Sequence, residues 1–269
     1  MQAEGIAEDV QVQNVPGAGG TVGLAQFVSS AAGDPSQLIV GGYVMVGAIL
    51  TNASPVSLAD VTPIARLTGE AVAVAVPADS PYQTIGDLVA ALKADPGAVS
   101  WGGGSAGGAD HITVGLLAKA AGVDPTAINY IAFSGGGEAL AAILGGQVTA
   151  GVSGVGEFLP QVEAGAMRIL AVSTAERAAN VDAPTLKEAG FDVALQNWRM
   201  VAAAPGLSPE QVAGITADIE ALAASEGWKA ALADRGWADT FLSGEAFATQ
   251  LAADTEQTAA ILKDIGLVQ

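Results

Sequence analysis

The segment from Trp101 to His111 offers more chemistry than any other part of this sequence. It is dense in glycine, contains the hydroxyl of Ser105 and ends on the only histidine of the chain. The pattern predicts a strand before it and a helix after it, so the segment would form a loop at the end of a strand. Such a loop suits three kinds of chemistry: dinucleotide binding, nucleophilic catalysis and binding of a small anion.

Dinucleotide binding has partial support. Gly102, Gly104 and Gly107 satisfy the G-x-G-x-x-G spacing. However, the next predicted strand, Asn129–Phe133, lacks an acidic residue at its end that would hold a ribose, and Asp124 precedes the strand instead. Chance matches are expected in a chain with 35 glycines. A nucleotide-dependent oxidoreductase therefore stays an alternative.

Nucleophilic catalysis would use Ser105, because Gly103 to Gly107 satisfy G-x-S-x-G. A serine hydrolase also needs a histidine delivered from a distant loop. The only histidine, His111, follows six residues later on the helix that the loop would open. A Ser–His triad is nearly excluded, and we predict no catalytic residue.

Anion binding needs glycine for close approach, a hydroxyl donor and a helix N-terminus, and it needs no base. Two further Ser/Gly loops repeat the design, at Ser134-Gly135-Gly136 and at Ser153-Gly154. All three follow predicted parallel strands, whose carboxyl ends form the ligand edge of open α/β sheets. The sequence thus predicts a shared anion site. The alternative is that the glycines only permit tight turns between strand and helix and that His111 has only a structural role.

Composition narrows the function further. With 28 acidic and 10 basic side chains the formal charge is −18, so we expect no nucleic-acid partner. The absence of cysteine and the single histidine exclude a structural zinc site, and we predict no metal and no cofactor. The longest apolar run, Leu38–Leu50, is too short to cross a bilayer. The start at Met1–Gly5 shows no export signal.

Short apolar runs alternate with helical patterns, which predicts an α/β fold with mainly parallel sheets. The predicted strands are Val10–Val15, Leu38–Gly42, Ala71–Val76, Val99–Trp101, Asn129–Phe133, Val148–Ser153, Met167–Ser173 and Arg199–Ala203. The predicted helices are Thr21–Ala31, one beginning at Thr84, Asp110–Ala121, Glu138–Leu144, Val155–Glu163, one beginning at Ser208 and Glu245–Ile265. Thr84 with Asp87, and Ser208 with Gln211, predict capped helix N-termini.

Two chain crossings divide the sequence into lobes. We expect them near 76–78 and 197–205, where apolar strands end. Residues 77–197 would form lobe 2, inserted between the two parts of lobe 1, residues 1–76 and 198–269. Two crossings would make a hinge, and the cleft between lobes would be the default ligand site.

The sequence resembles the receptors of tripartite tricarboxylate transporters, the TctC or Bug family. The signature N-x-P-G-A-G-G is matched by Asn14–Gly20, and further family segments follow in order along nearly the whole chain. These segments are Ala65-Arg66-Leu67, Val76-Pro77, Lys93–Gly97, the Gly/Ser loop that ends in His111, Leu144–Val148, Ala164–Ser173 and Pro184–Gly190.

The resemblance implies a two-lobed periplasmic-binding-protein-like fold of type II. It implies a monomer in the periplasm or another extracytoplasmic space that captures a small carboxylate and hands it to membrane permease subunits. Carried over by position, the ligand residues are Tyr43, Gly104, Ser105, His111, Ser134, Gly135, Gly136, Ser153 and Gly154. The family often has Tyr-Lys where this chain has Phe133-Ser134, and an Asp or Asn near Ser153–Val155, so the ligand's identity stays open.

The resemblance also implies a strand, a ligand loop and a first helix ahead of Val10–Gly20, which this sequence lacks. We therefore expect an N-terminal truncation that removed the first strand of lobe 1 together with an export signal. A gap or a forced neighbour between Val10–Val15 and Leu38–Gly42 should result.

Overall fold

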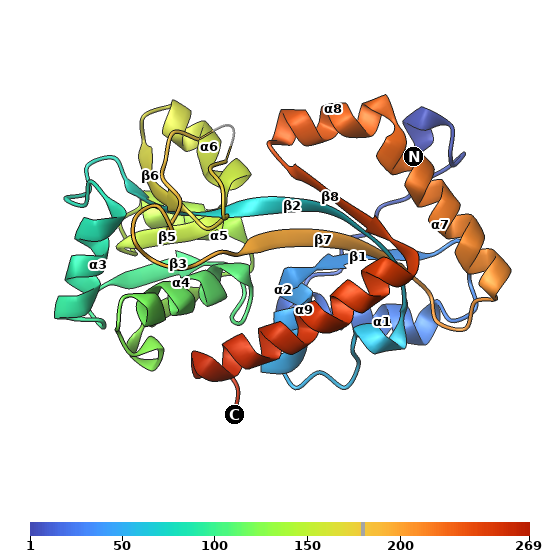
Figure 1. The fold of residues 1–269 in the computed structure, drawn as a ribbon, viewed down its shortest axis with the longest axis horizontal. Coiled ribbons are helices and arrows are strands. Elements are labelled where there is room, and N and C mark those ends of the chain that lie inside the picture. Colours follow the sequence, from blue (N-terminus) through green and yellow to red (C-terminus); the bar gives the residue numbers. More distant parts are fainter. Residues whose placement is uncertain (179–180) are drawn as a thin grey trace. The chain divides into compact units, whose positions relative to one another are not determined.

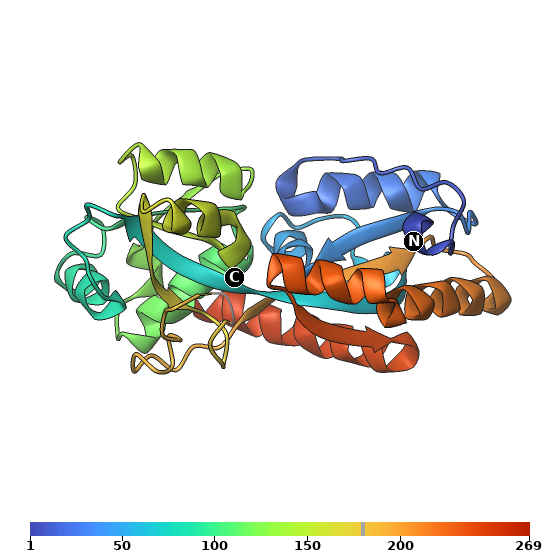
Figure 2. The ribbon, with the colours of Figure 1, turned by 90° about the horizontal axis from the view of Figure 1, so that it is seen from above.

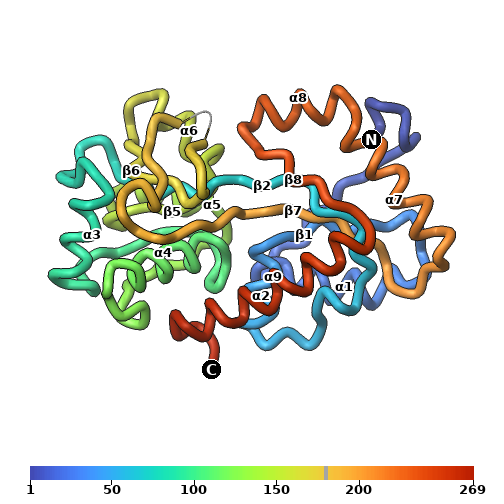
Figure 3. Tube along the Cα trace, in the orientation of Figure 1, coloured from blue at the N-terminus to red at the C-terminus, as the bar shows by residue number. Residues whose placement is uncertain are grey.

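A computed structural model describes residues 1–178 and 181–269 (Figure 1). The chain divides into two compact units. Unit 1 comprises Met1–Gly69 and Trp198–Thr258, and unit 2 comprises Glu70–Asn197 and Ala259–Gln269. The chain passes between the units within strands β2 (Thr62–Pro77) and β7 (Gln196–Ala203) and within helix α9 (Gly244–Asp264), as the tube in Figure 3 lets the reader follow.

Unit 2 is built on a mixed sheet. Its strands are the second half of β2, β3 (Ser100–Gly103), β4 (Asn129–Ala132), β5 (Ala150–Gly154) and β6 (Met167–Val172). β3 pairs in parallel with both β4 and β5, and β2 runs antiparallel between β5 and β6. The run Val72–Val76 in β2 is fully buried, as expected of a strand covered on both faces.

Helices cover both faces of this sheet. They are α3 (Ile85–Ala94), α4 (Ala109–Ala120), α5 (Gly136–Leu144) and α6 (Val155–Glu163). α5 and α6 pack together on one face, while α4 lies against β3 and β5 from the other (Figure 2). The predicted cap of α3 is confirmed, since Thr84 Oγ1 accepts from Asp87 N–H and Asp87 accepts from Thr84 N–H.

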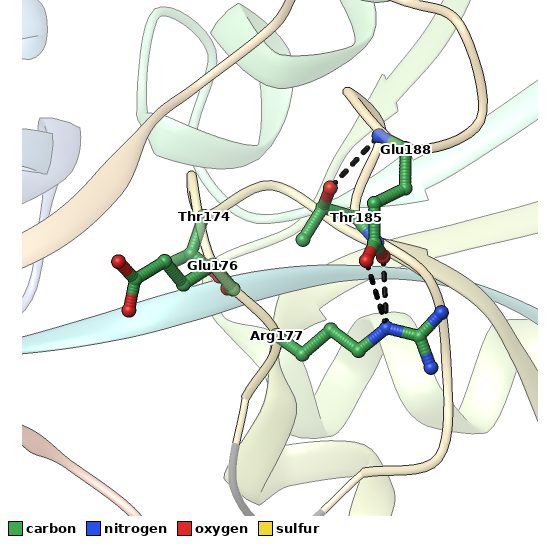
Figure 4. Close-up of polar contacts among 5 residues, drawn as sticks. All are labelled: Thr174, Glu176, Arg177, Thr185 and Glu188. Carbon is green, nitrogen blue, oxygen red and sulfur yellow. Dashed lines mark hydrogen bonds and ion pairs between the residues drawn. The ribbon is translucent and has the colours of Figure 1, made fainter.

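Residues of the loop between β6 and β7 form hydrogen bonds with one another (Figure 4). Glu188 accepts a hydrogen bond from Arg177 Nε at 2.9 Å, and its own N–H donates to Thr185 Oγ1 at 3.0 Å. Hydrogen bonds from the Thr185 N–H and from Arg177 lower the pKa of Glu188. Thr185 also bridges to Val172 at the end of β6, so these contacts fasten the loop to the sheet.

Unit 1 holds β1 (Leu38–Gly42), β7, the first half of β2 and β8 (Ala238–Ser243). Its helices are α1 (Thr21–Ser30), α2 (Tyr43–Thr51), α7 (Pro209–Ala224), α8 (Glu226–Arg235) and most of α9. Its core joins the sheet to Ile219 of α7.

The predicted Ser208–Gln211 cap is confirmed. No described helix combines the length and the apolar character that crossing a bilayer requires.

Two predictions about unit 1 are wrong, and three of its elements were not predicted. Val10–Val15 forms no strand, because β1 takes its partner from β7 and the exposed segment around Val12 pairs with nothing described. The pairs β1–β7 and β2–β8 are antiparallel, so the prediction of a mainly parallel sheet is wrong for unit 1, while unit 2 has a mixed sheet with two parallel and two antiparallel pairs. The helices α2 and α8 and the strand β8 were not predicted, since α2 lies inside an apolar run without helical spacing.

Two of the unit boundaries also differ from the expected ones. The first crossing lies at Gly69/Glu70 rather than at 76–78, because β2 is long enough to pair with β8 first and with β5 and β6 afterwards. Pro77, the last residue of β2, pairs with Met167 of β6 and so belongs to the sheet of unit 2. Residues 259–269 belong to unit 2 because Ile265 packs against α4 at Gly115.

Candidate functional site

Three loops meet at one edge of the sheet in unit 2. The strands β4, β3 and β5 are parallel neighbours, and they end at Ala132, Gly103 and Gly154. From these ends the chain enters α5, α4 and α6 respectively. The predicted adjacency of the three Ser/Gly loops is therefore confirmed, and three helix N-termini converge there.

The first loop is held from within. Gly104 N–H donates to Asp110 Oδ2 at 2.8 Å, and Gly104 O accepts from the Tyr130 hydroxyl at 2.8 Å. Gly107 adopts a left-handed conformation, with φ of 74°, and its N–H donates to His111 Nδ1 at 3.3 Å. In the described part of the chain the Ser105 hydroxyl makes no hydrogen bond, so it is free to act as a donor.

His111 lies in the first turn of α4, where its ring stacks on Tyr130. The ring centroids are 4.0 Å apart and the planes differ by 1°. Burial lowers the pKa of His111 to about 4, so the imidazole is neutral at neutral pH. Burial is also the main cause that raises the pKa of Tyr130, and the charge of Asp110 adds to it. The Nδ1 atom of His111 faces a backbone donor rather than Ser105, which does not fit the base of a serine hydrolase.

The second and third loops contact each other. Gly135 caps α5, and an ideal Cβ on Gly136 would collide with the Glu157 carboxylate and lie 2.7 Å from Ser153 Oγ. Ser153 is only 4% exposed, at the end of β5. Glycine at 136 therefore lets the start of α5 approach a hydroxyl and a carboxylate of the neighbouring loop.

Carboxylates of this chain already occupy part of the loop backbone. Besides Asp110 on Gly104, Glu138 Oε2 accepts from Ser134 N–H at 3.1 Å. Glu70 Oε1 accepts from Gly156 N–H at 2.9 Å, and the Glu70 carboxylate lies against Gly154. These acceptors lower the number of backbone donors open to a ligand, so side-chain donors gain importance.

Tyr43 is the one predicted ligand residue in unit 1. It begins α2 at the end of β1, is 7% exposed, and packs edge-on against Trp198 with centroids 6.2 Å apart. Burial raises the pKa of Tyr43, a hydrogen bond with the Thr258 side chain opposes this, and Asp254 adds to it. The other eight predicted residues lie in unit 2.

Sequence reasoning missed the acidic side chains and Tyr130. Glu70 lies far from the loops in sequence, inside a long strand, so no local signal could have placed it. Asp110 and Glu157 stand in the first turns of their helices, where carboxylates that bond loop N–H groups are common. Tyr130 could have been suspected, because it is the one tyrosine within a predicted strand of this edge. Among the described residues, no group of three His, Cys, Asp or Glu side chains could hold a metal ion.

Comparison with known families gives one match that spans the chain. Residues 2–267 match the tripartite tricarboxylate transporter family receptor, TctC. A UPF0065 protein in the gbd 5′ region of Cupriavidus necator is 28% identical over 268 residues, which cover 98% of this chain and 80% of that protein. Protein BugT of Bordetella pertussis is 25% identical over 98% of this chain and 81% of its own length.

Solved structures share the fold. A Rhodopseudomonas palustris protein with adipate superposes with a TM-score of 0.87 at 22% identity, covering 98% of this chain and 91% of the other. MatC from the same organism, with bound malate, gives a TM-score of 0.79 at 24% identity and covers 97% and 91%. The expected two-lobed, periplasmic-binding-protein-like α/β fold is thereby confirmed.

Proposed function

This chain belongs to the tripartite tricarboxylate transporter family of receptors, and we propose that it captures a small carboxylate and delivers it to membrane permease subunits. The observation that supports this most strongly is the meeting of three Ser/Gly loops at the carboxyl edge of β4, β3 and β5. Each loop opens a helix, so the edge carries a positive potential from three helix dipoles.

The proposed contacts are hydroxyl and backbone donors rather than an arginine clamp. Ser105 and Ser153 supply hydroxyls, Gly135 leaves open space beside the first turn of α5, and Gly136 makes room for Ser153 and the Glu157 carboxylate. His111 supplies a ring nitrogen, and Gly104, Ser134 and Gly154 shape the loops. Tyr43 is proposed as a contact from unit 1. The two R. palustris proteins that share the fold were solved with dicarboxylates, adipate and malate, which fits this ligand class.

The acidic residues at the edge restrict which carboxylates fit. Glu157 at Gly136 would repel an anion placed directly on the start of α5. A ligand with one carboxylate near the first loop and a neutral or cationic group toward Glu157 avoids this repulsion. We therefore rank monocarboxylates and amino acids with longer side groups above compact tricarboxylates.

Location and partners follow from the same proposal. A receptor that serves membrane permeases works in the periplasm or another extracytoplasmic space, where it acts as a monomer. Expression with an added export signal, beside the cognate permease genes, would test delivery by uptake of labelled ligand.

Binding itself is tested by calorimetry with adipate, L-malate, L-glutamate and citrate, with NAD as an enzyme-type control. At least one carboxylate should bind, and Ser153→Ala should weaken binding about tenfold because one charge-assisted hydrogen bond is lost. Ser29→Ala, an exposed position in α1, serves as the matched control. Binding of NAD without binding of any carboxylate, or equal effects of both serine variants, would contradict the proposal.

A further inference from the structure

Tyr130 of β4 holds the first loop at both of its ends. Its hydroxyl donates to Gly104 O at 2.8 Å, where the loop begins, and its ring stacks on His111, where the loop has turned into α4. An ideal Cβ on Gly103 would collide with the Tyr130 hydroxyl, so glycine there permits the approach. One side chain from a neighbouring strand thus fixes the loop and the imidazole together.

The contacts of His111 define where its proton resides. Nδ1 accepts the Gly107 N–H, and a nitrogen that accepts a hydrogen bond carries no proton. The ring is therefore neutral and protonated on Nε2. Gly107 can make this contact because its left-handed backbone, with φ of 74°, turns its N–H toward the start of α4.

We propose that Tyr130 is a positioning residue that locks His111 in the Nε2-protonated form, so that Nε2 donates a hydrogen bond to the ligand's carboxylate. This inference rests on the proposed function. It adds a residue outside the predicted ligand set and assigns His111 a single chemical form.

A neutral donor suits the charges around it. Among the described residues, the titratable groups next to the ring are the Tyr130 hydroxyl on β4, on which the ring stacks, and Asp110, which precedes His111 in α4 and whose charge acts on Tyr130. The strands β3 and β5 and the turn Pro125–Ala127, which pack against α4, carry no charged residue. A charged imidazolium would attract a ligand anion more strongly, but the affinity for the ligand would then change with pH near 6.5. Held neutral, His111 donates equally well from about pH 5.5 to about pH 8, so ligand affinity should stay constant over that range.

The single histidine makes the test direct. When these 269 residues are labelled with ¹⁵N-histidine, long-range ¹H–¹⁵N spectra report the tautomer and the titration of one imidazole only. The unchanged protein should show the Nε2–H tautomer and a pKa of about 4. A dominant Nδ1–H tautomer, or titration near 6.5, would overturn the proposal.

Two substitutions separate positioning from simple support of the fold. Tyr130→Phe keeps the stacked ring and should keep the tautomer while weakening adipate or L-malate binding about threefold. Tyr130→Leu removes both contacts, so the tautomers should mix, the titration should move toward 6.5, and affinity should fall about tenfold and vary with pH. Tyr82→Phe, a partly exposed tyrosine before α3, is the control and should change neither spectrum nor affinity. An unaltered imidazole spectrum in Tyr130→Leu would refute the positioning role. If that variant does not fold, the tautomer of the unchanged protein and the affinity of Tyr130→Phe still test the proposal.

The two proposals fail in distinguishable ways. If the unchanged protein binds no carboxylate but shows the expected tautomer, and Tyr130→Leu disturbs it, the receptor function fails while the positioning by Tyr130 stands. If carboxylates bind and His111→Ala leaves the affinity unchanged, the receptor function stands and the donor role of His111 is refuted.

Discussion

Gly151 in the middle of β5 allows that strand to lie against α5, and its replacement by alanine tests how tightly this contact is packed. An ideal Cβ at Gly151 would collide with Ile143 Cδ1, lie 2.7 Å from Ile143 Cγ1 and lie 3.3 Å from Phe158 Cζ. Ile143 and Phe158 are fully buried, so neither side chain can swing into solvent. We expect Gly151→Ala to destabilise the protein by about 1–3 kcal/mol, the usual cost of overpacking a core.

The sign of the effect should reverse when Ile143 is shortened. Ile143→Ala alone should cost about 2–5 kcal/mol because it leaves a cavity. In that background the methyl group that Gly151→Ala adds enters vacated space, where burial contributes about 0.8 kcal/mol and loss of a strand glycine adds about 0.5–1 kcal/mol. Gly151→Ala should therefore stabilise the Ile143→Ala protein by about 1.5 kcal/mol.

Urea unfolding followed by circular dichroism measures all four proteins of this cycle. The contact also bears on the site, because β5 ends in Ser153 and Gly154 and α5 begins with Gly136, so a displaced strand would separate the two loops. Gly137→Ala, at a glycine whose added Cβ meets nothing within 4 Å, is the matched control. Equal effects of Gly151→Ala in both backgrounds would show that β5 and α5 are not in close contact and would refute the reasoning.

Three further predictions address charge, capping and pH. Glu157→Gln should raise the affinity for adipate about fivefold at low salt, because repulsion between two like charges about 4 Å apart costs about 1 kcal/mol in water. Glu163→Gln, at the other end of α6, should leave the affinity unchanged. Calorimetry at low and high salt measures both variants. Thr84→Ala should cost about 1 kcal/mol in urea unfolding, because it removes the cap of α3, and an unchanged midpoint would contradict this. Because the pKa of His111 is lowered from 6.5 to about 4, its stabilising contribution is complete above pH 6.5 and is lost as the pH falls toward 4. Compared with His111→Gln, the unchanged protein should lose at most about 1.4 kcal/mol per pH unit across that window, and parallel pH profiles of the two proteins would refute it.

Local signals predicted unit 2 well. The capping pair Thr84–Asp87, the spacing of the helices and the apolar strands are short-range features, and the parallel order of β4, β3 and β5 follows from helices that connect them. Unit 1 was harder because its strand partners come from distant parts of the chain. β1 pairs with β7, which follows it by more than half of the chain, and Val10–Val15 has strand-like alternation but finds no partner among the described residues.

The site shows the same division between what is local and what is not. Serine and glycine at strand ends mark where donors can stand, and a sequence displays them directly. Whether a donor is free depends on acceptors that arrive from elsewhere, as Glu70 reaches Gly156 from a strand 86 residues away. A glycine-rich loop therefore predicts an anion site only where its N–H groups do not already donate to carboxylates of the same chain. We therefore propose that the side-chain donors Ser105, Ser153 and His111 make the main ligand contacts, and that Tyr130 fixes which ring nitrogen of His111 carries the proton.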